Sequence, residues 1–198
     1  MDAAHTGLVG ILLAAGRGRR YDASGRVNKL LTPAARGPHA GEALAVAAAR
    51  TLRNAVPRVV AVVRPADDAA ARDLAERLAQ AGCEVVINDD ADSGMGSSLA
   101  CGVRAAPDAS GWIIALADMP AVEPETIRAV AEALARGACT AAPYVGDERG
   151  HPVGFSATLR APLLALTGDA GARALLLQHP PDRIAVNDSG VLDDVDHP

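Results

Sequence analysis

Short apolar runs alternate with longer, alanine-rich amphipathic segments along most of the chain. Runs of this length are typical of buried strands, and they predict strands over residues 8–14, 58–64, 84–89, 111–118, 139–145, 151–157 and 183–188. The longer segments predict helices over residues 41–55, 67–82, 97–106 and 124–137, and two short helices over 161–166 and 170–179. Pro124 and Gly137 mark the expected start and end of one of these helices.

The order of these elements indicates the fold class. Strands that are apolar on both faces, each followed by a helix, are typical of a parallel sheet covered by helices on both sides. The sequence therefore predicts a three-layer α/β fold with a Rossmann-like, mostly parallel sheet. In such sheets ligands bind beyond the carboxyl ends of the strands, so functional residues are expected in the loops that follow the apolar runs.

Composition narrows the class of protein. With 198 residues, 49% of them hydrophobic, the chain is long enough for one sizeable core and short for two independent domains. A net charge of -5 disfavours nucleic acid as a partner, because nucleic acid requires a basic face. No apolar run approaches the ~20 residues of a membrane helix, and the N-terminus lacks the basic region of a signal peptide. Three cysteines without CxxC spacing fit reduced thiols, so we expect a cytoplasmic protein with no membrane partner.

The loop after the first predicted strand combines glycines with positive charge. Gly16 and Gly18 let the backbone approach a ligand and present N–H groups to an anion. Arg17 and Arg20 add guanidinium groups that suit phosphate oxygens, and Lys29 adds a compact ammonium. The loop is not a Walker A motif, because no GK[ST] closes it, and it lacks the last glycine of the dinucleotide fingerprint. It favours phosphate binding, with a solvated basic turn as the alternative.

Small residues occur where the helix after the third predicted strand should begin. Gly94 and Gly96 expose backbone N–H groups, and the hydroxyls of Ser97 and Ser98 suit a sugar or a base. Ordinary helix capping is the alternative, although two glycines around Met95 exceed what a cap requires.

Carboxylates occur at two places that the predicted topology could bring together. Asp118 ends the predicted strand 111–118, at the edge where ligands bind. It is either a helix cap or a ligand for a hard cation such as Mg²⁺. The C-terminal stretch adds Asp188, Asp193, Asp194 and Asp196, some of which are expected to be turn residues.

Two further loops contain polar residues. Arg149 and His151 lie at a junction between a loop and a strand, and Asp169 and Arg173 lie near the start of a short helix. A single histidine is more often a structural hydrogen-bonding group than a functional one, and Asp169 is most simply explained as a helix cap.

Taken together and in this order, the stretches LLAAGRGRR…NKLL, GMGSSLACG, LADMP, RGHPVGF, GDAGARALL and DDVDHP resemble the MobA-like nucleotidyltransferases, and most closely the molybdenum cofactor cytidylyltransferases. They run from residue 12 to 198, so the resemblance covers nearly the whole chain. It implies one domain over residues 1–198, with a fold of the nucleotide-diphospho-sugar transferase type. Residues 1–105 would mainly bind the nucleotide, and residues 106–198 would hold the metal and the acceptor.

The resemblance also implies a role for each matching position. The base and phosphates would be lined by Leu13, Ala14, Ala15, Gly16 and Gly18, with Arg17, Arg20 and Lys29 on the triphosphate. Cytosine and ribose would face Gly94, Met95 and Ser98, and a molybdopterin acceptor would face Arg149, His151, Asp169 and Arg173. Mg²⁺ would be held by Asp118 together with Asp196 or Asp194. Catalysis would depend on Lys29, Asp118 and Arg17.

The implied reaction is attack by an acceptor phosphate on the α-phosphorus of CTP, with pyrophosphate as the leaving group. A phosphate monoester is largely ionised at neutral pH, so no general base is required, and the basic loop would stabilise the leaving group. Two alternatives stay open. The chain could use GTP or another nucleotide with a different phosphorylated acceptor, or it could be a non-catalytic nucleotide-binding chaperone that delivers cofactor to a molybdoenzyme. An NAD-dependent oxidoreductase is disfavoured by the broken glycine fingerprint.

Overall fold

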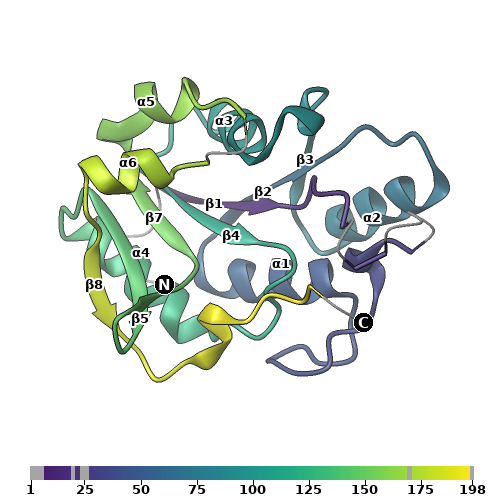
Figure 1. Cartoon of the computed structure of the whole chain (residues 1–198), viewed down its shortest axis with the longest axis horizontal. Coiled ribbons are helices and arrows are strands. Elements are labelled where there is room, and N and C mark those ends of the chain that lie inside the picture. Colours follow the sequence, from purple (N-terminus) through teal and green to yellow (C-terminus); the bar gives the residue numbers. More distant parts are fainter. Residues whose placement is uncertain (1–6, 19–20, 23–26, 169–170, 197–198) are drawn as a thin grey trace.

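An eight-stranded sheet runs through the middle of the molecule, with helices on both faces (Figure 1). The computed structural model describes residues 7–18, 21–22, 27–168 and 171–196. The strands are β1 (Leu8–Leu13), β2 (Arg58–Val63), β3 (Glu84–Ile87), β4 (Gly111–Leu116), β5 (Thr140–Val145), β6 (Glu148–Arg149), β7 (Val153–Ser156) and β8 (Asp182–Ala185). The α-helices are α1 (Leu44–Ala55), α2 (Ala69–Gln80), α3 (Met95–Ala105), α4 (Pro124–Ala135), α5 (Arg160–Leu164) and α6 (Arg173–Gln178).

The sheet is mostly parallel, as the sequence predicts. Its order is β3-β2-β1-β4-β7-β5-β6, with β8 paired to β5. The pairs β2–β3, β1–β2, β1–β4 and β5–β8 are parallel, whereas β7 is antiparallel to both β4 and β5. Because β1 lies in the middle of the parallel part, the loop that follows it opens beside the ends of β2 and β4.

Alternation of buried side chains explains why both faces of the sheet are covered. In β1, Leu8 and Leu12 belong to one buried cluster, and Val9 and Ile11 belong to another. The first cluster includes residues of α1, α2 and α4, and the second includes residues of α3, α5 and α6. Both sides of each central strand are therefore withdrawn from water, which is why these strands are apolar throughout.

The bounds of several elements differ from the predicted ones for local reasons. Strand β3 ends at Ile87 rather than at residue 89, because the side-chain Oδ1 of Asn88 accepts a hydrogen bond from the backbone N–H of Asp90 and turns the chain. The predicted strand 183–188 is wrong in its second half, since β8 ends at Ala185 and Asp188 caps a 3-10 turn, Ser189–Leu192. The sequence pattern did not predict strand β6, because two residues are too few to show an alternation of apolar and polar positions.

The predictions about the cysteines and about membrane helices can be compared with the structure. Cys83, Cys101 and Cys139 are free thiols. Among the described residues no helix combines the length and the apolar character that crossing a bilayer requires.

Candidate functional site

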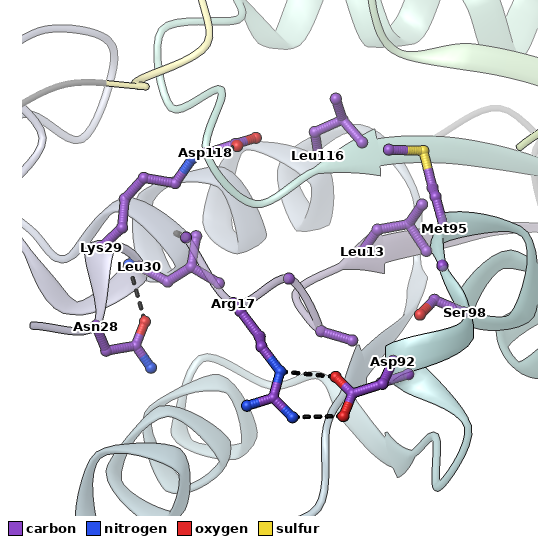
Figure 2. A pocket seen from close by; sticks show the side chains of 15 residues that line it. Leu13, Arg17, Asn28, Lys29, Leu30, Asp92, Met95, Ser98, Leu116 and Asp118 are labelled. Atoms are coloured by element: carbon purple, nitrogen blue, oxygen red, sulfur yellow. Dashed lines mark hydrogen bonds and ion pairs between the residues drawn. The ribbon is translucent and has the colours of Figure 1, made fainter. Parts of the chain in front are cut away.

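A cavity of about 550 Å³ lies beyond the carboxyl ends of β1 and β4. Its wall consists of Leu13, Ala15, Gly16, Arg17, Gly18, Asn28, Lys29, Leu30, Ala91, Asp92, Gly94, Met95, Ser98, Leu116 and Asp118 (Figure 2). The cavity thus brings together the glycine loop, the start of α3 and the end of β4. This is the edge at which ligands bind in open α/β sheets.

The glycine loop lies where the sequence predicts it, with two exceptions among the expected residues. Gly18 has a φ of +60°, a conformation that glycine adopts without strain, and its carbonyl accepts a hydrogen bond from the N–H of Tyr21. Ala14 is buried, its N–H donates to the carbonyl of Val62, and it is not part of the cavity wall. Arg20 lies outside the described residues.

Lys29 and Asp118 contact one another in the wall of this cavity. Lys29 begins a 3-10 turn whose start is capped by the side chain of Asn28, which accepts a hydrogen bond from the N–H of Leu30. The lysine is only 7% exposed, so its ammonium is held against the wall rather than in solvent. Its Nζ donates to Oδ2 of Asp118 at 2.7 Å and lies 3.6 Å from Oδ1 of Asp196.

Three carboxylates form one cluster at this point. Oxygens of Asp118, Asp194 and Asp196 lie within 4.8 Å of one another. The C-terminal segment is tied to the end of β4 by a hydrogen bond from the N–H of Val195 to the carbonyl of Asp118, at 3.0 Å. A set of carboxylate oxygens at this spacing suits a hard divalent cation.

The other two C-terminal acids are not part of this cluster. Asp188 accepts hydrogen bonds from the N–H of Glu123 and the hydroxyl of Thr126, and so fixes the start of α4. Asp193 forms an ion pair with Arg36. Both are structural acids, as the sequence allows for some members of this group.

Arg17 lines the cavity but its guanidinium is engaged by a carboxylate. Its Nε donates to Oδ1 of Asp92 at 2.7 Å, and a second nitrogen pairs with Oδ2 (Figure 2). Arg64, which follows β2, donates to the same carboxylate at 2.8 Å. These hydrogen bonds to two arginines hold the pKa of Asp92 well below its usual range. Any phosphate that Arg17 binds must therefore compete with Asp92.

The start of α3 does not use its serines as caps, so that alternative is wrong. Gly94 is the N-cap residue, with a φ of +122°, and no side chain in the described part of the chain caps the helix. Ser97 and Ser98 instead accept hydrogen bonds from the side-chain amide of Asn88, at 2.9 and 3.1 Å. Gly94, Met95 and Ser98 all line the cavity.

A second cavity, of about 170 Å³, adjoins the first and contains three of the expected acceptor residues. Arg149, His151 and Arg173 line it, whereas Asp169 lies outside the described residues. Its remaining wall is mostly apolar, and Leu13, Met95 and Leu116 belong to the walls of both cavities. A ligand in one cavity would therefore contact side chains that also border the other.

His151 is held in an environment that favours its neutral form. Burial is the main cause that lowers the pKa of this imidazole, and the neighbouring charge of Arg149 adds to it. A hydrogen bond with the backbone of Ile114 and the carboxylates of Asp118 and Asp194 act in the opposite direction. Its Nδ1 is buried and has no hydrogen-bonding partner among the described residues.

Sequence reasoning missed several residues of the first cavity. They are Asn28, Leu30, Ala91, Asp92 and Leu116. Asn28 and Leu30 flank the predicted lysine, and Leu116 lies two residues before the predicted aspartate, so proximity to those positions was the available signal. For Asp92 the sequence contained no comparable signal, since acids next to glycine-rich turns are common in loops.

A basic glycine loop, a lysine, a carboxylate cluster and a cavity at the carboxyl edge of a parallel sheet define a protein of the nucleotide-binding Rossmann-like class. The model of the MobA-like NTP transferase domain matches residues 10–184, and the chain belongs to this family.

Known proteins similar to this chain agree with that assignment in fold and length. Nicotine blue oxidoreductase of Paenarthrobacter nicotinovorans is 34% identical over 199 aligned residues, which cover 96% of this chain and 92% of that protein. The crystal structure of Rv0371c from Mycobacterium tuberculosis is 28% identical, with a TM-score of 0.76 over 94% of this chain and 90% of that one. A complex of Rv0371c with manganese is 26% identical, with a TM-score of 0.72 over 91% and 89% of the two chains. A nucleotidyl transferase from Methanothermobacter shares the fold, with a TM-score of 0.76, 24% identity, and 96% and 92% of the two chains covered.

The family match confirms the resemblance to the MobA-like proteins, and with it the nucleotidyltransferase class. The solved structures confirm the predicted fold. CTP, the molybdopterin acceptor and the individual residue roles stay predictions.

Proposed function

We propose that this chain transfers CMP from CTP to the phosphate of a molybdopterin-type acceptor and releases pyrophosphate. The observation that carries the proposal is the 2.7 Å contact between Nζ of Lys29 and Oδ2 of Asp118 on the wall of the 550 Å³ cavity. A cation for the leaving group and a carboxylate for a metal thus share one cavity with the glycine loop. That combination is what phosphoryl transfer requires, since its catalysis depends on positioning and on charge stabilisation.

The residues present fit a divalent cation. Three carboxylates with oxygens within 4.8 Å of one another are hard donors, and the ammonium of Lys29 shows that the cluster already attracts positive charge. Asp118, Asp194 and Asp196 would hold the ion, with Mg²⁺ as the expected metal. When bound, such an ion neutralises negative charge on phosphate oxygens.

The protein's own groups would bind and orient the triphosphate. Gly16 has no side chain, and the space that a Cβ would occupy contains no other protein atom of the described residues within 4 Å. Phosphate oxygens can therefore come close to the backbone N–H groups of the loop. Lys29 would stabilise the pyrophosphate that leaves, and Arg17 would join it once released from Asp92. No general base is needed, because the acceptor phosphate is already ionised at neutral pH.

The second cavity supports the proposal that the acceptor binds next to the nucleotide. It adjoins the nucleotide cavity through Leu13, Met95 and Leu116, and Arg149 and Arg173 add two positive charges to a mostly apolar wall. A wall of this kind suits a heterocycle that carries an anionic group. The imidazole of His151, whose neutral form is favoured, adds a planar uncharged ring to this wall.

The test is pyrophosphate release from each of the four nucleoside triphosphates, with Mg²⁺ or Mn²⁺, in the presence and absence of molybdopterin. Release with CTP that depends on molybdopterin is the expected result. Asp118→Asn keeps the shape of the side chain and should slow the reaction by about 10²- to 10³-fold. Asp147→Asn, on an exposed acid of the turn between β5 and β6, is the matched control. Full metal-dependent activity of Asp118→Asn would overturn the metal assignment.

Other outcomes identify the alternatives. Pyrophosphate release with GTP, or with another phosphorylated acceptor, would still indicate a nucleotidyltransferase, but with a different substrate. Nucleotide binding without pyrophosphate release, under all conditions, would indicate the non-catalytic chaperone.

A second candidate is an oxidoreductase. The name of the 34% identical relative from Paenarthrobacter nicotinovorans favours it. Calorimetric titration with NADH separates the two proposals: tight NADH binding without pyrophosphate release from any nucleotide would favour the oxidoreductase.

A further inference from the structure

Asn88 is a buried residue that the proposed reaction does not use. It follows β3, is only 6% exposed, and is anchored by a hydrogen bond from its own N–H to the carbonyl of Val63, at 2.8 Å. Its side chain contacts both serines at the start of α3. Of these two, Ser98 lines the 550 Å³ cavity and Ser97 does not.

The orientation of the Asn88 amide follows from its partners. The N–H of Asp90 is a donor only, and it lies 3.1 Å from the side-chain oxygen of Asn88. The amide nitrogen must therefore point the other way, where its two hydrogens donate to the hydroxyl oxygens of Ser97 and Ser98.

This orientation decides what each serine can do with its own proton. The hydroxyl of Ser97 donates to backbone carbonyls, those of Asp90 at 2.7 Å and Gly94 at 2.9 Å. Within the described part of the chain, the hydroxyl of Ser98 accepts from Asn88 and has no acceptor for its own proton. Because Ser98 lines the cavity, that proton is available to a ligand there.

We propose that Asn88 is a specificity-determining positioning residue, which makes Ser98 a hydrogen-bond donor to a carbonyl oxygen of the nucleobase. The inference rests on the proposed function in that it takes a nucleotide to occupy the 550 Å³ cavity. Figure 2 shows Ser98 near Met95 and Leu13, whereas Lys29 and Asp118 lie at the other side of the cavity. Apolar side chains next to one polar donor suit the planar face and the edge of a base, and the charged groups suit the phosphates.

A donor at this place discriminates between bases. Cytosine and guanine carry a ring carbonyl, whereas adenine carries none and offers only ring nitrogens as acceptors. A site built to hydrogen-bond a ligand group rejects an analogue that lacks the group, because its own polar atom is then left unpaired.

The test is a double-mutant cycle on the affinity for CTP and ATP, measured by calorimetry. Asn88→Asp keeps the size of the side chain but replaces the amide donor with an acceptor, so that the Ser98 hydroxyl turns its proton toward position 88. We expect the dissociation constant for CTP to rise roughly tenfold relative to that for ATP, as for a lost hydrogen bond. The ratio is used because the added charge acts on both triphosphates alike.

The background variant separates positioning from a general structural effect. In the S98A background, Asn88→Asp should leave the ratio of the two dissociation constants within about twofold, since no hydroxyl is left to orient. Ser97→Ala removes the other acceptor of the same amide and should also leave the ratio unchanged. If Asn88→Asp does not fold, Asn88→Ala should lower the preference for CTP by a smaller factor, again only when Ser98 is present.

An equal change of the ratio with and without Ser98, or no change at all, would overturn the role of Asn88, as would the absence of nucleotide binding. A different result would overturn the proposed function alone: the chain binds CTP and shows the expected coupling between Asn88 and Ser98, but it releases no pyrophosphate.

Discussion

Nζ of Lys29 lies 2.7 Å from Oδ2 of Asp118, although the two residues are 89 positions apart in the chain. The same nitrogen lies 3.6 Å from Asp196, so one ammonium contacts two acids of the cluster. Lys29 is also the only lysine among the 19 lysine and arginine residues. Unlike a planar guanidinium, an ammonium is a compact charge with three donors, which explains the use of lysine in this narrow position.

Replacing Lys29 should change catalysis and metal binding in opposite directions. Lys29→Met keeps most of the side-chain volume and removes the charge, so we expect turnover to fall by about 10²- to 10³-fold. The affinity of the cluster for Mn²⁺ without nucleotide should rise, by about fivefold, because the competing cation is gone. Pyrophosphate release measures the first effect and calorimetric titration with Mn²⁺ the second. In Lys29→Arg, which keeps the charge, the Mn²⁺ affinity should not increase. A parallel loss of activity and Mn²⁺ binding in Lys29→Met would contradict this account.

The ion pair between Arg17 and Asp92 should weaken nucleotide binding. Asp92→Asn removes the charge that holds Arg17 and leaves its guanidinium available to phosphate. Because the pair is exposed, the expected gain is modest, with the KM for the nucleotide falling about two- to fivefold. The effect should shrink as salt is added, since salt screens exposed charges.

A matched control exists at the other edge of the sheet. Glu84 holds Arg58 through two hydrogen bonds of 2.8 Å, at the start of β2 and β3 and away from the cavity. Glu84→Gln should leave the KM unchanged. If the KM in Asp92→Asn rises instead, Asp92 positions Arg17 rather than competing for it.

Much of the fold could be predicted from the sequence because its cause is local. Strands such as β1 and β4 are apolar throughout, and proline or glycine marks the start or end of several helices. The positions of Lys29 and Asp118 followed from the rule that ligands gather at one edge of a parallel sheet. The structure places both residues on the wall of one cavity, whereas their direct contact was not predicted.

The remaining parts of the site depend on contacts that no local pattern records. Asp92 is joined to Arg17 over 75 positions and to Arg64 over 28 positions. The serines of α3 suggested a cap, but their partner is Asn88, at the end of another element. Of the C-terminal acids, Asp194 and Asp196 join the cluster while Asp188 and Asp193 do not, since tertiary packing decides which way each one faces.

Gly190 should be required for the carboxylate cluster, although it is not part of it. A Cβ at this position would lie 2.2 Å from the carbonyl oxygen of Ala121, which is far inside contact distance. Gly190→Ala would therefore push the C-terminal segment away from the loop after β4, and with it Asp194 and Asp196 from Asp118. We expect weaker Mn²⁺ binding, measured by calorimetry, with little change in the affinity for metal-free nucleotide. Unchanged Mn²⁺ affinity in a folded Gly190→Ala variant would show that the segment does not need this close approach.

His151 should make the stability of the protein depend on pH. Burial and the charge of Arg149 lower the pKa of its imidazole in the folded state, against the opposing effect of a hydrogen bond with the backbone of Ile114 and of two nearby carboxylates. In the unfolded chain the imidazole returns to its ordinary pKa, about 6.5, so below that pH the unfolded state binds the proton more readily. The free energy of unfolding should therefore fall as the pH is lowered through 6.5. Urea denaturation at pH 7.5 and 5.5 measures this slope, and it should be shallower in His151→Gln, whose side chain does not titrate. Equal slopes in the two proteins would mean that the buried imidazole is not the group that couples folding to protons in this range.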